Sequence, residues 1–412
     1  MKKILIVLDG AAGLPHPKLG GKSVIEAANT PNLDFLAKNG CLGYMYPIDE
    51  KTVPGSDNSL ISIFGNDPKK CRRGVYGAIG VGLKLKKGDL AIRCNFGTIR
   101  DLKSRRVVDR RAGRTLSSRE AAILASALVK GVKIPGPFEF KSAVQHRGIL
   151  ILKGVKSDKI TNVDPEWSTG GEQKFNFSVP LKNDEDSEYA AFLLNNFLTQ
   201  AYLILNNHPI NKERKRKGLL PANFLFTRGG GVTVEKLKKY RNWMSINPMP
   251  LEIGISKLSG MKVFDFPYPE LKGIDSYANY YKGLRRSIRF AKKIIKKHHS
   301  FYKGCYIQFK ETDIPGHDNK PFEKKNMLEM IDKKFFGFLR AFAEKNPLKI
   351  VVTCDHSTPC ILKKHSSHPV PVLVYDGKKR DHAKSFSEKE SRKGILGKMY
   401  GKKFIRKTGL DK

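Results

Sequence analysis

Ser56 lies at the predicted start of a helix. It precedes the helix-capping residues Asp57, Asn58 and Ser59, and an apolar run with helical spacing follows at residues 60–64. A hydroxyl at a helix N-terminus lies beside free backbone N–H groups and the positive end of the helix dipole, which suits phosphate binding and stabilises an alkoxide. Serine is also a common helix cap, so this stretch alone leaves open whether Ser56 is a nucleophile or only a cap.

Four apolar, β-branched runs have aspartate or histidine residues next to them. The runs at residues 4–8, 305–309 and 350–353 are followed by such residues, and the run at residues 370–375 is preceded by one. Open α/β sheets place their ligands at the carboxyl ends of parallel strands, so these side chains are expected to converge on one edge of a sheet. They are Asp9, Asp313, His317, Asp355, His356 and His365.

Mixed carboxylate and imidazole ligands suit Mn²⁺ or Zn²⁺, with Mg²⁺ as the alternative if oxygen ligands dominate. Two such ions about 4 Å apart can clamp a phosphoryl group and activate a serine hydroxyl. Each pair alone has an ordinary explanation, because an Asp-x-x-x-His pair is common in loops and Asp355-His356 could be a cap and a surface imidazole. Their combination at strand ends, with a serine at a helix start, favours a metal-dependent phosphoryl-transfer site.

The elements that would position these residues indicate an α/β fold. Residues 4–8 form a continuous apolar run that predicts a buried parallel strand. Residues 32–40 predict a short helix, and residues 73–90 are glycine-rich and predict turns. The three later runs predict further strands of the same sheet.

The middle of the chain differs in character from both ends. Basic strands and turns there precede a helix predicted over residues 188–205, whose apolar residues at helical spacing favour a core position. We therefore expect residues 85–231 to form a second, inserted domain. Residues 1–84 and 232–412 are then expected to form the first domain together.

Length and charge bound the class of protein. At 412 residues the chain is long for one core, and its 40% hydrophobic and 9% aromatic content indicates a folded globular protein. The net charge of +38, from 77 Lys+Arg against 39 Asp+Glu, implies an anionic partner such as a phosphorylated metabolite, nucleic acid or an acidic surface. The basic clusters at residues 285–293 and 296–299 predict the solvated face of a helix.

Cysteine spacing and hydropathy indicate a cytoplasmic protein. The six cysteines form no Cys-x-x-Cys pair, so reduced thiols are expected and neither a disulfide framework nor a zinc ribbon. The apolar run before Asp9 is too short for a signal peptide, and no run approaches the roughly 18 to 20 residues of a membrane span. No membrane partner is therefore expected.

Several motifs together resemble the alkaline phosphatase superfamily. They are Asp9-Gly10, Pro54-Gly-Ser-Asp57, Asp313-x-x-Gly-His317, Asp355-His356 and His365-x-x-x-Pro-Val-Pro371. More narrowly, the chain resembles the archaeal-type, 2,3-bisphosphoglycerate-independent phosphoglycerate mutases. That narrower resemblance runs from residue 3 to about residue 375 and rests also on residues 26–34, 44–48, 93–96, 109–114 and 218–223.

The resemblance implies a role for each matched residue. Ser56 would be the nucleophile that becomes phosphoserine. One metal ion would be held by Asp313, His317 and His365, and the other by Asp9, Ser56, Asp355 and His356. Manganese is the expected metal, with zinc or magnesium as alternatives, and 2,3-bisphosphoglycerate would not be required. The fold would be an alkaline-phosphatase-like, mostly parallel sheet flanked by helices, with an inserted α+β domain that closes over the substrate.

The resemblance also implies a basic substrate site in the insertion. The residues that match its motifs are Arg93, Asp109, Arg110, Arg111, Arg114 and Arg228. Arginine forks suit carboxylate and phosphate groups, although each arginine alone could equally form an exposed ion pair. The chain departs from the family at two points: it lacks a lysine expected near Ile253, for which Lys257 is the substitute considered, and His368 falls where the family needs no histidine.

The expected activity is the interconversion of 3-phosphoglycerate and 2-phosphoglycerate through a phosphoserine, a step of glycolysis. One alternative is a related phosphotransferase or phosphatase for another small phosphate ester, because the inserted domain sets specificity. Another is a nucleic-acid-binding protein, suggested by the net charge of +38. Since the basic clusters are scattered and no nucleic-acid motif is present, only non-specific binding of that kind is expected.

Overall fold

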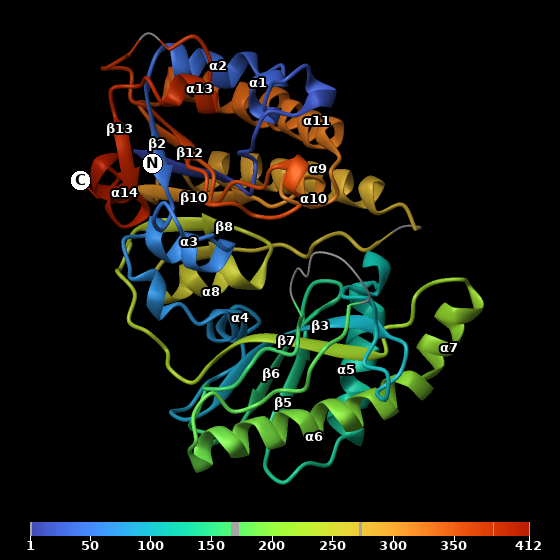
Figure 1. The fold of residues 1–412 in the computed structure, drawn as a ribbon. Helices are drawn as coiled ribbons and strands as arrows, with labels where there is room; N and C mark the ends of the chain where they lie inside the picture. Colours follow the sequence, from blue (N-terminus) through green and yellow to red (C-terminus); the bar gives the residue numbers. More distant parts are fainter. Residues whose placement is uncertain (1, 166–172, 272–273, 382, 412) are drawn as a thin grey trace.

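Two β-sheets organise the chain, each with its own hydrophobic core (Figure 1). The computed structural model describes residues 2–165, 173–271, 274–381 and 383–411. We call the part built on the larger sheet the core unit, and residues 85–231 the insertion. The five strands of the smaller sheet lie between Leu90 and Gly231. Where one domain ends and the next begins remains the prediction given above.

The core unit contains an eight-stranded sheet in the order β13-β2-β12-β11-β1-β10-β8-β9. Five of its pairings are parallel and two, those of β12 with β11 and β2, are antiparallel. The mostly parallel α/β sheet predicted from the sequence is therefore confirmed. Its strands are β1 Lys3–Leu8, β2 Cys41–Tyr46, β8 Trp243–Ile246, β9 Lys262–Phe264, β10 Gly304–Phe309, β11 Lys349–Thr353, β12 Val370–Tyr375 and β13 Gly397–Tyr400.

Strand β1 lies between β10 and β11 and is parallel to both. Its residues Ile4 to Val7 are fully buried, because helices cover both faces of the sheet and leave no polar side to the strand. The registers pair Leu8 with Phe309 and Val7 with Thr353, so the three strands end at nearly the same level. The residues that follow them therefore meet at one edge of the sheet.

Helices flank this sheet on both faces (Figure 1). The long predicted basic helix is α9, and its residues Arg285, Arg289, Lys293 and Lys297 are exposed, as expected for a solvated face. The helices of the core unit are α1 Val24–Ala27, α2 Pro31–Lys38, α3 Ser56–Ile63, α4 Arg73–Gly80, α8 Pro250–Leu258, α9 Ser276–His298, α10 Ile314–His317, α11 Pro321–Ile331, α12 Gly337–Lys345, α13 Glu388–Ser391 and α14 Gly401–Lys407.

The insertion is an antiparallel sheet covered by helices. Its strands are β3 Leu90–Ile99, β4 Val107–Asp109, β5 Phe138–Ser142, β6 Arg147–Leu152 and β7 Phe224–Gly231. Its helices are α5 Ser118–Gly131, α6 Glu185–Asn207 and α7 Pro209–Arg216. Helix α6 contains the helix predicted over residues 188–205, and its buried face packs in the core of the insertion, which confirms the predicted core position.

The prediction of turns across residues 73–90 is wrong for its first part, because α4 occupies Arg73–Gly80. The glycines recur every third residue, at 74, 77 and 80, and let the helix approach other backbones closely. A Cβ atom on Gly74 would lie 2.1 Å from the carbonyl oxygen of Ala91 in β3, and one on Gly80 would lie 1.9 Å from that of Pro250 in α8. Helix α4 therefore joins the core unit to the insertion, and its glycines serve packing.

None of the helices in the described part of the chain combines the length and the hydropathy that a bilayer crossing requires.

Candidate phosphoryl-transfer site

Ser56 is the first residue of α3, and Gly55 is the residue that caps this helix. The amide of Gly55 donates to Asn58 Oδ1 at 2.8 Å and closes the first turn. The Ser56 side chain is therefore not used as the cap, which removes the alternative that the sequence had left open. Its Oγ lies 3.2 Å from His356 Nε2, and the residue is 7% exposed.

His356 lies at the centre of a buried polar group at the edge of the sheet. Its Nε2 lies 3.2 Å from Ser56 Oγ, 3.4 Å from Asp355 Oδ2 and 3.5 Å from Asp9 Oδ1. Asp9 directly follows β1, and Asp355 and His356 come just after the end of β11, so the parallel pairing of these strands brings them together. These three residues and Ser56 are the predicted ligands of one metal ion. His356 Nε2 lies within 3.5 Å of an oxygen atom of each of the other three.

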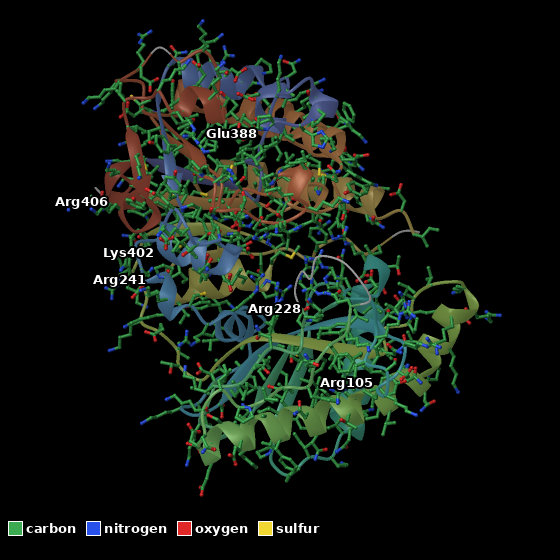
Figure 2. The ribbon with its side chains drawn as sticks, in the orientation of Figure 1. Arg105, Arg228, Arg241, Glu388, Lys402 and Arg406 are labelled. Carbon is green, nitrogen blue, oxygen red and sulfur yellow. The ribbon has the colours of Figure 1, made fainter. Side chains whose placement is uncertain are left out.

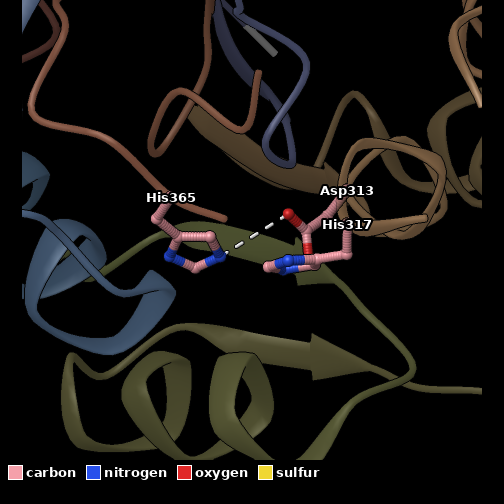
Figure 3. A group of neighbouring side chains, drawn as sticks. All are labelled: Asp313, His317 and His365. Carbon is pink, nitrogen blue, oxygen red and sulfur yellow. Dashed lines mark ion pairs between the residues drawn. The ribbon is translucent and has the colours of Figure 1, made fainter. Parts of the chain in front are cut away.

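Asp313, His317 and His365 form a second group (Figure 3). Asp313 Oδ2 lies 3.3 Å from His317 Nε2, and Asp313 Oδ1 lies 3.6 Å from His365 Nε2. The ring of His365 stacks on that of His356 with centroids 3.7 Å apart, so the two groups are adjacent. Asp313 also belongs with Asp9 and His356 to a group whose ligand atoms lie within 4.8 Å of one another.

The histidine rings are held by their Nδ1 atoms. His317 Nδ1 lies 3.1 Å from the carbonyl oxygen of Lys363, and His365 Nδ1 lies 2.8 Å from that of Pro54. His356 Nδ1 lies 3.0 Å from Thr358 Oγ1, which in turn donates to Asp313 Oδ1 at 2.8 Å. This arrangement is typical of metal-binding histidines, because it fixes the ring and leaves Nε2 with its lone pair toward the ion.

The donor set fits divalent metal ions by its chemistry as well as by its geometry. Burial, with Asp355 close by, raises the pKa of Asp9 well above its ordinary value, and Asp9 Oδ1 has no hydrogen-bond partner within the described residues. Burial also lowers the pKa of His356 well below its ordinary value, which favours the neutral imidazole that a metal binds. Lys310 supplies one positive charge beside these two buried carboxylates, and a divalent ion would offset their charge further.

Gly10 shows how closely these loops are packed. Its φ is +55°, and a Cβ atom there would lie 2.5 Å from Asp313 Oδ1 and 2.7 Å from Thr358 Oγ1. Only glycine fits this position, because both the backbone angle and the space exclude a side chain. The glycine of the Asp9-Gly10 pair is therefore required by the packing of these loops, in addition to any chemical role of the aspartate.

Polar side chains outside the predicted set hold the site in place. Gln308 Nε2 donates to Asp9 Oδ2 at 2.8 Å and to Asp355 Oδ2 at 3.1 Å. The ammonium group of Lys310 contacts Asp9 and lies 3.0 Å from Glu252 Oε1. The fully buried Lys324 donates to the carbonyl oxygens of Gly10 and Thr358 at 2.7 and 2.8 Å. Sequence analysis missed all three, although Gln308 and Lys310 flank the end of a strand that it predicted.

The site opens into a cavity of about 580 Å³ between the core unit and the insertion. Ser56, Asp313, His317 and His365 line it on the core side. Five arginines also line it, namely Arg73, Arg93, Arg111, Arg147 and Arg228, and Figure 2 shows Arg228 near the junction of the two parts. Burial, together with the neighbouring Arg114 and Arg147, lowers the pKa of Arg111 to about 10.

The structure separates the six predicted substrate residues into two groups. Arg93, Arg111 and Arg228 line the cavity. The other three are engaged elsewhere: Asp109 Oδ1 accepts from the amides of Arg111 and Gly113, Arg110 pairs with Asp164 at 2.5 Å, and Arg114 pairs with Asp318 at 2.6 Å.

Two of the arginines that line the cavity, Arg73 and Arg147, were not predicted from the sequence. Arg73 is the first residue of α4, which was predicted as turns, and Arg147 is the first residue of β6. Lys257, considered as the substitute for a lysine near Ile253, is exposed and donates to the carbonyl oxygen of Ile79 at 3.4 Å. His368 bonds to Ser366 and belongs to neither donor group.

Comparison with known proteins identifies the family. The family model described as 2,3-bisphosphoglycerate-independent phosphoglycerate mutase matches residues 37–211. A protein of that name from Pyrococcus abyssi is 39% identical over 411 residues, which cover 97% of this chain and 95% of the relative. Another, from Thermococcus kodakarensis, is 37% identical over 409 residues, with 97% and 94% covered. The chain belongs to the 2,3-bisphosphoglycerate-independent phosphoglycerate mutase family.

Solved structures agree with this family membership. The cofactor-independent phosphoglycerate mutase from Thermoplasma acidophilum is 30% identical, and 98% of each chain aligns with a TM-score of 0.54. A structure from Pyrococcus horikoshii is 29% identical with a TM-score of 0.75, covering 98% of this chain and 95% of that one. The resemblance inferred from short motifs is therefore confirmed over nearly the whole length.

Proposed function

We propose that this protein interconverts 3-phosphoglycerate and 2-phosphoglycerate without 2,3-bisphosphoglycerate, by way of a phosphoserine at Ser56. The observation that carries the proposal is that Ser56 Oγ lies 3.2 Å from His356 Nε2 at the wall of a cavity that five arginines also line. A nucleophile and a substrate-sized anion site thus share one enclosed space. The relatives from Thermococcus kodakarensis and Pyrococcus abyssi are named 2,3-bisphosphoglycerate-independent phosphoglycerate mutase.

Two divalent ions are expected, with manganese as the first candidate. Asp313, His317 and His365 would hold one, and Asp9, Ser56, Asp355 and His356 would hold the other. When bound, such ions neutralise phosphate charge and lower the pKa of a serine hydroxyl. Support comes from the two donor groups, the Nδ1 bonds that orient the histidines, and the buried Asp9 Oδ1 that has no hydrogen-bond partner among the described residues.

The protein's own residues bind and orient the substrate. Ser56 lies at the N-terminus of α3, where the positive end of the helix dipole favours a bound phosphate group. The arginines from both parts of the chain offer planar, two-pronged donors to the phosphate and to the carboxylate of glycerate. Substrate held in this way is positioned for attack, which supplies a large share of the rate enhancement.

The insertion explains why the phosphate returns to glycerate and not to water. After Ser56 takes the phosphate, glycerate must stay, turn, and present its other hydroxyl. We infer that the insertion is a closing domain, because the cavity lies between it and the core unit and Arg114 pairs with Asp318 across the junction. An enclosed site keeps bulk water away from the phosphoserine.

The test is to strip the protein of metal, reload it with Mn²⁺, and supply 3-phosphoglycerate without 2,3-bisphosphoglycerate. 2-Phosphoglycerate and free phosphate are followed together. We expect 2-phosphoglycerate to form with little phosphate released. Phosphate alone would indicate a phosphatase, and no reaction would direct the search to other small phosphate esters. A cytoplasmic location is the prediction consistent with such metabolites.

A further inference from the structure

His146 is a buried histidine in the wall of the cavity. It is 4% exposed, and its Nδ1 has no hydrogen-bond partner among the described residues. Its backbone is fixed, because its carbonyl oxygen accepts from the amide of Phe96 in β3 at 2.7 Å. An unpaired buried polar group is costly to leave unsatisfied, so its presence beside a substrate cavity calls for a functional explanation.

Arginines surround this imidazole. Burial, together with the charges of Arg147, Arg111 and Arg93, lowers the pKa of His146 well below its ordinary value. The ring is therefore neutral in the free protein near neutral pH. The carboxylate and phosphate of a bound substrate would place negative charge among the same arginines, and negative charge nearby favours a protonated imidazole.

Among the described residues that line the cavity from the insertion, His146 is suited to proton transfer in a way that the others are not. The other titratable residues that line the cavity from the described part of the insertion are arginines, namely Arg93, Arg111, Arg147 and Arg228. An arginine stays protonated and cannot accept a proton. On the core side, Lys310 is bound to Asp9 and Glu252, and Glu311 accepts from Tyr268 at 3.1 Å.

The proposed reaction needs a group that both gives and takes a proton. The glycerate oxygen that loses the phosphate must gain a proton, and the hydroxyl that receives it must lose one. We infer that His146 carries this proton between the two hydroxyls of glycerate, an inference that rests on the proposed mutase function.

The two half-reactions balance with His146 in this role. In the first, the Ser56 oxygen bonds to phosphorus, the bond from phosphorus to O3 breaks, and protonated His146 gives its proton to O3. In the second, O2 bonds to phosphorus, the Ser56–phosphorus bond breaks, and the O2 proton passes to His146. His146 takes the proton that it gives to O3 from solvent as the negatively charged substrate binds, and it recovers a proton from O2, so the protonated imidazole ends as it began. With metal ions bound, Ser56 would begin and end as a deprotonated oxygen.

The test compares two phosphate donors in His146→Gln, with His298→Gln as the matched control on α9. p-Nitrophenyl phosphate has a leaving group that needs no proton, whereas 3-phosphoglycerate has one that does. We expect 3-phosphoglycerate turnover to fall 10²- to 10⁴-fold. Phosphorylation of Ser56 by the aryl ester should stay within about threefold of wild type, which also shows that the variant is folded. His298→Gln should match wild type with both donors.

Equal losses with both donors, or no loss with 3-phosphoglycerate, would overturn the inference. Added imidazole should restore activity to His146→Ala, which gives a second measurement should the glutamine variant fold poorly. Wild-type protein that makes no 2-phosphoglycerate would refute the proposed function instead. The comparison of alkyl with aryl phosphates would then still decide whether His146 supplies the proton.

Discussion

Arg114 of the insertion holds Asp318 of the core unit through two parallel hydrogen bonds, 2.6 Å from Nη1 to Oδ2 and 2.9 Å from Nη2 to Oδ1. Asp318 directly follows His317, and the hydroxyl of Tyr277 also donates to it at 2.8 Å. One bidentate pair thus ties the insertion to the segment that carries a predicted metal ligand. We therefore propose that Arg114 takes part in closure of the insertion, and its contact with substrate stays a prediction.

Breaking this pair should open the site to water. We expect Arg114→Met to lower kcat/KM for 3-phosphoglycerate by about 10- to 100-fold, because small misplacements of a held substrate are costly. Free phosphate released per 2-phosphoglycerate formed should rise. The free energy of unfolding should fall by only about 1 kcal/mol, since both side chains are partly exposed.

Arg216→Met is the matched control for Arg114→Met. Arg216 makes a similar two-pronged pair with Glu213, but within α7 and on the surface. Its loss should leave the ratio of phosphate to 2-phosphoglycerate unchanged. If Arg114→Met also leaves that ratio unchanged, the closure role of Arg114 is wrong.

Lys324 should be far more important for stability than its neighbour Lys325. The Lys324 ammonium is buried and bonds to carbonyl oxygens in the loops after β1 and β11, whereas Lys325 pairs with Glu329 at a partly exposed site. Lys324→Met leaves two buried carbonyl groups unpaired and should lower the free energy of unfolding by about 2–4 kcal/mol. Lys325→Met should lower it by less than about 1 kcal/mol. Urea unfolding of both variants checks this, and equal effects would contradict it.

Two histidines three residues apart should differ in metal binding. His365 belongs to a donor group with Asp313 and His317, whereas His368 only bonds to Ser366. Titration of metal-free protein with Mn²⁺ should show affinity weakened more than tenfold in His365→Ala and within about twofold of wild type in His368→Ala. Mn²⁺ at 100 times its Kd should stabilise wild type by about 2.7 kcal/mol. Comparable losses in both variants would contradict the assignment of ligands.

Asp164 gives a prediction of pH dependence away from the metal site. It is buried beside Arg110 at 2.5 Å and Arg228 at 3.7 Å. Burial alone would raise its pKa, but Arg110 and Arg228 hold the pKa of Asp164 below its ordinary value. Its carboxylate therefore stabilises the fold above the unfolded pKa of about 3.9, and this contribution is lost as the pH falls through the lower, folded pKa.

Unfolding of Asp164→Asn across pH measures this contribution. The variant should be about 3–5 kcal/mol less stable than wild type at pH 7, because two arginines lose a buried partner. The difference should persist down to about pH 4 and narrow below it. The control Asp186→Asn, at an exposed position of α6, should change stability by less than about 0.5 kcal/mol. A difference that grows on acidification would contradict the argument.

The residues at the sheet edge could be predicted from sequence because their positions depend on strands alone. Apolar runs predicted β1, β10 and β11, and parallel pairing then places Asp9, Asp313 and Asp355 together. Most of the cavity wall could not be found in this way. Which arginines reach the cavity depends on how the insertion packs on the core unit, and that depends on the glycines of α4, which resemble turn residues in sequence.

Arg110 and Arg147 show, at single residues, why local sequence does not predict which arginines reach the cavity. Arg110 lies in a motif that matches the family, yet Asp164, 54 residues later in the chain, pairs with it. Arg147 lies in no matched motif, yet the start of β6 places it in the cavity. Pairings between residues distant in sequence decide both outcomes, and no local pattern carries that information.

The most direct test of the central claim is to find the covalent phosphate. Mn²⁺-loaded protein is mixed with 3-phosphoglycerate, quenched in acid within milliseconds, and digested for mass spectrometry. Ser59→Ala, three residues further along α3, is the control for Ser56→Ala. We predict phosphate on Ser56 in wild type and in Ser59→Ala, with no phosphopeptide and no 2-phosphoglycerate from Ser56→Ala. Phosphate on another residue, or 2-phosphoglycerate formed by Ser56→Ala, would contradict the account.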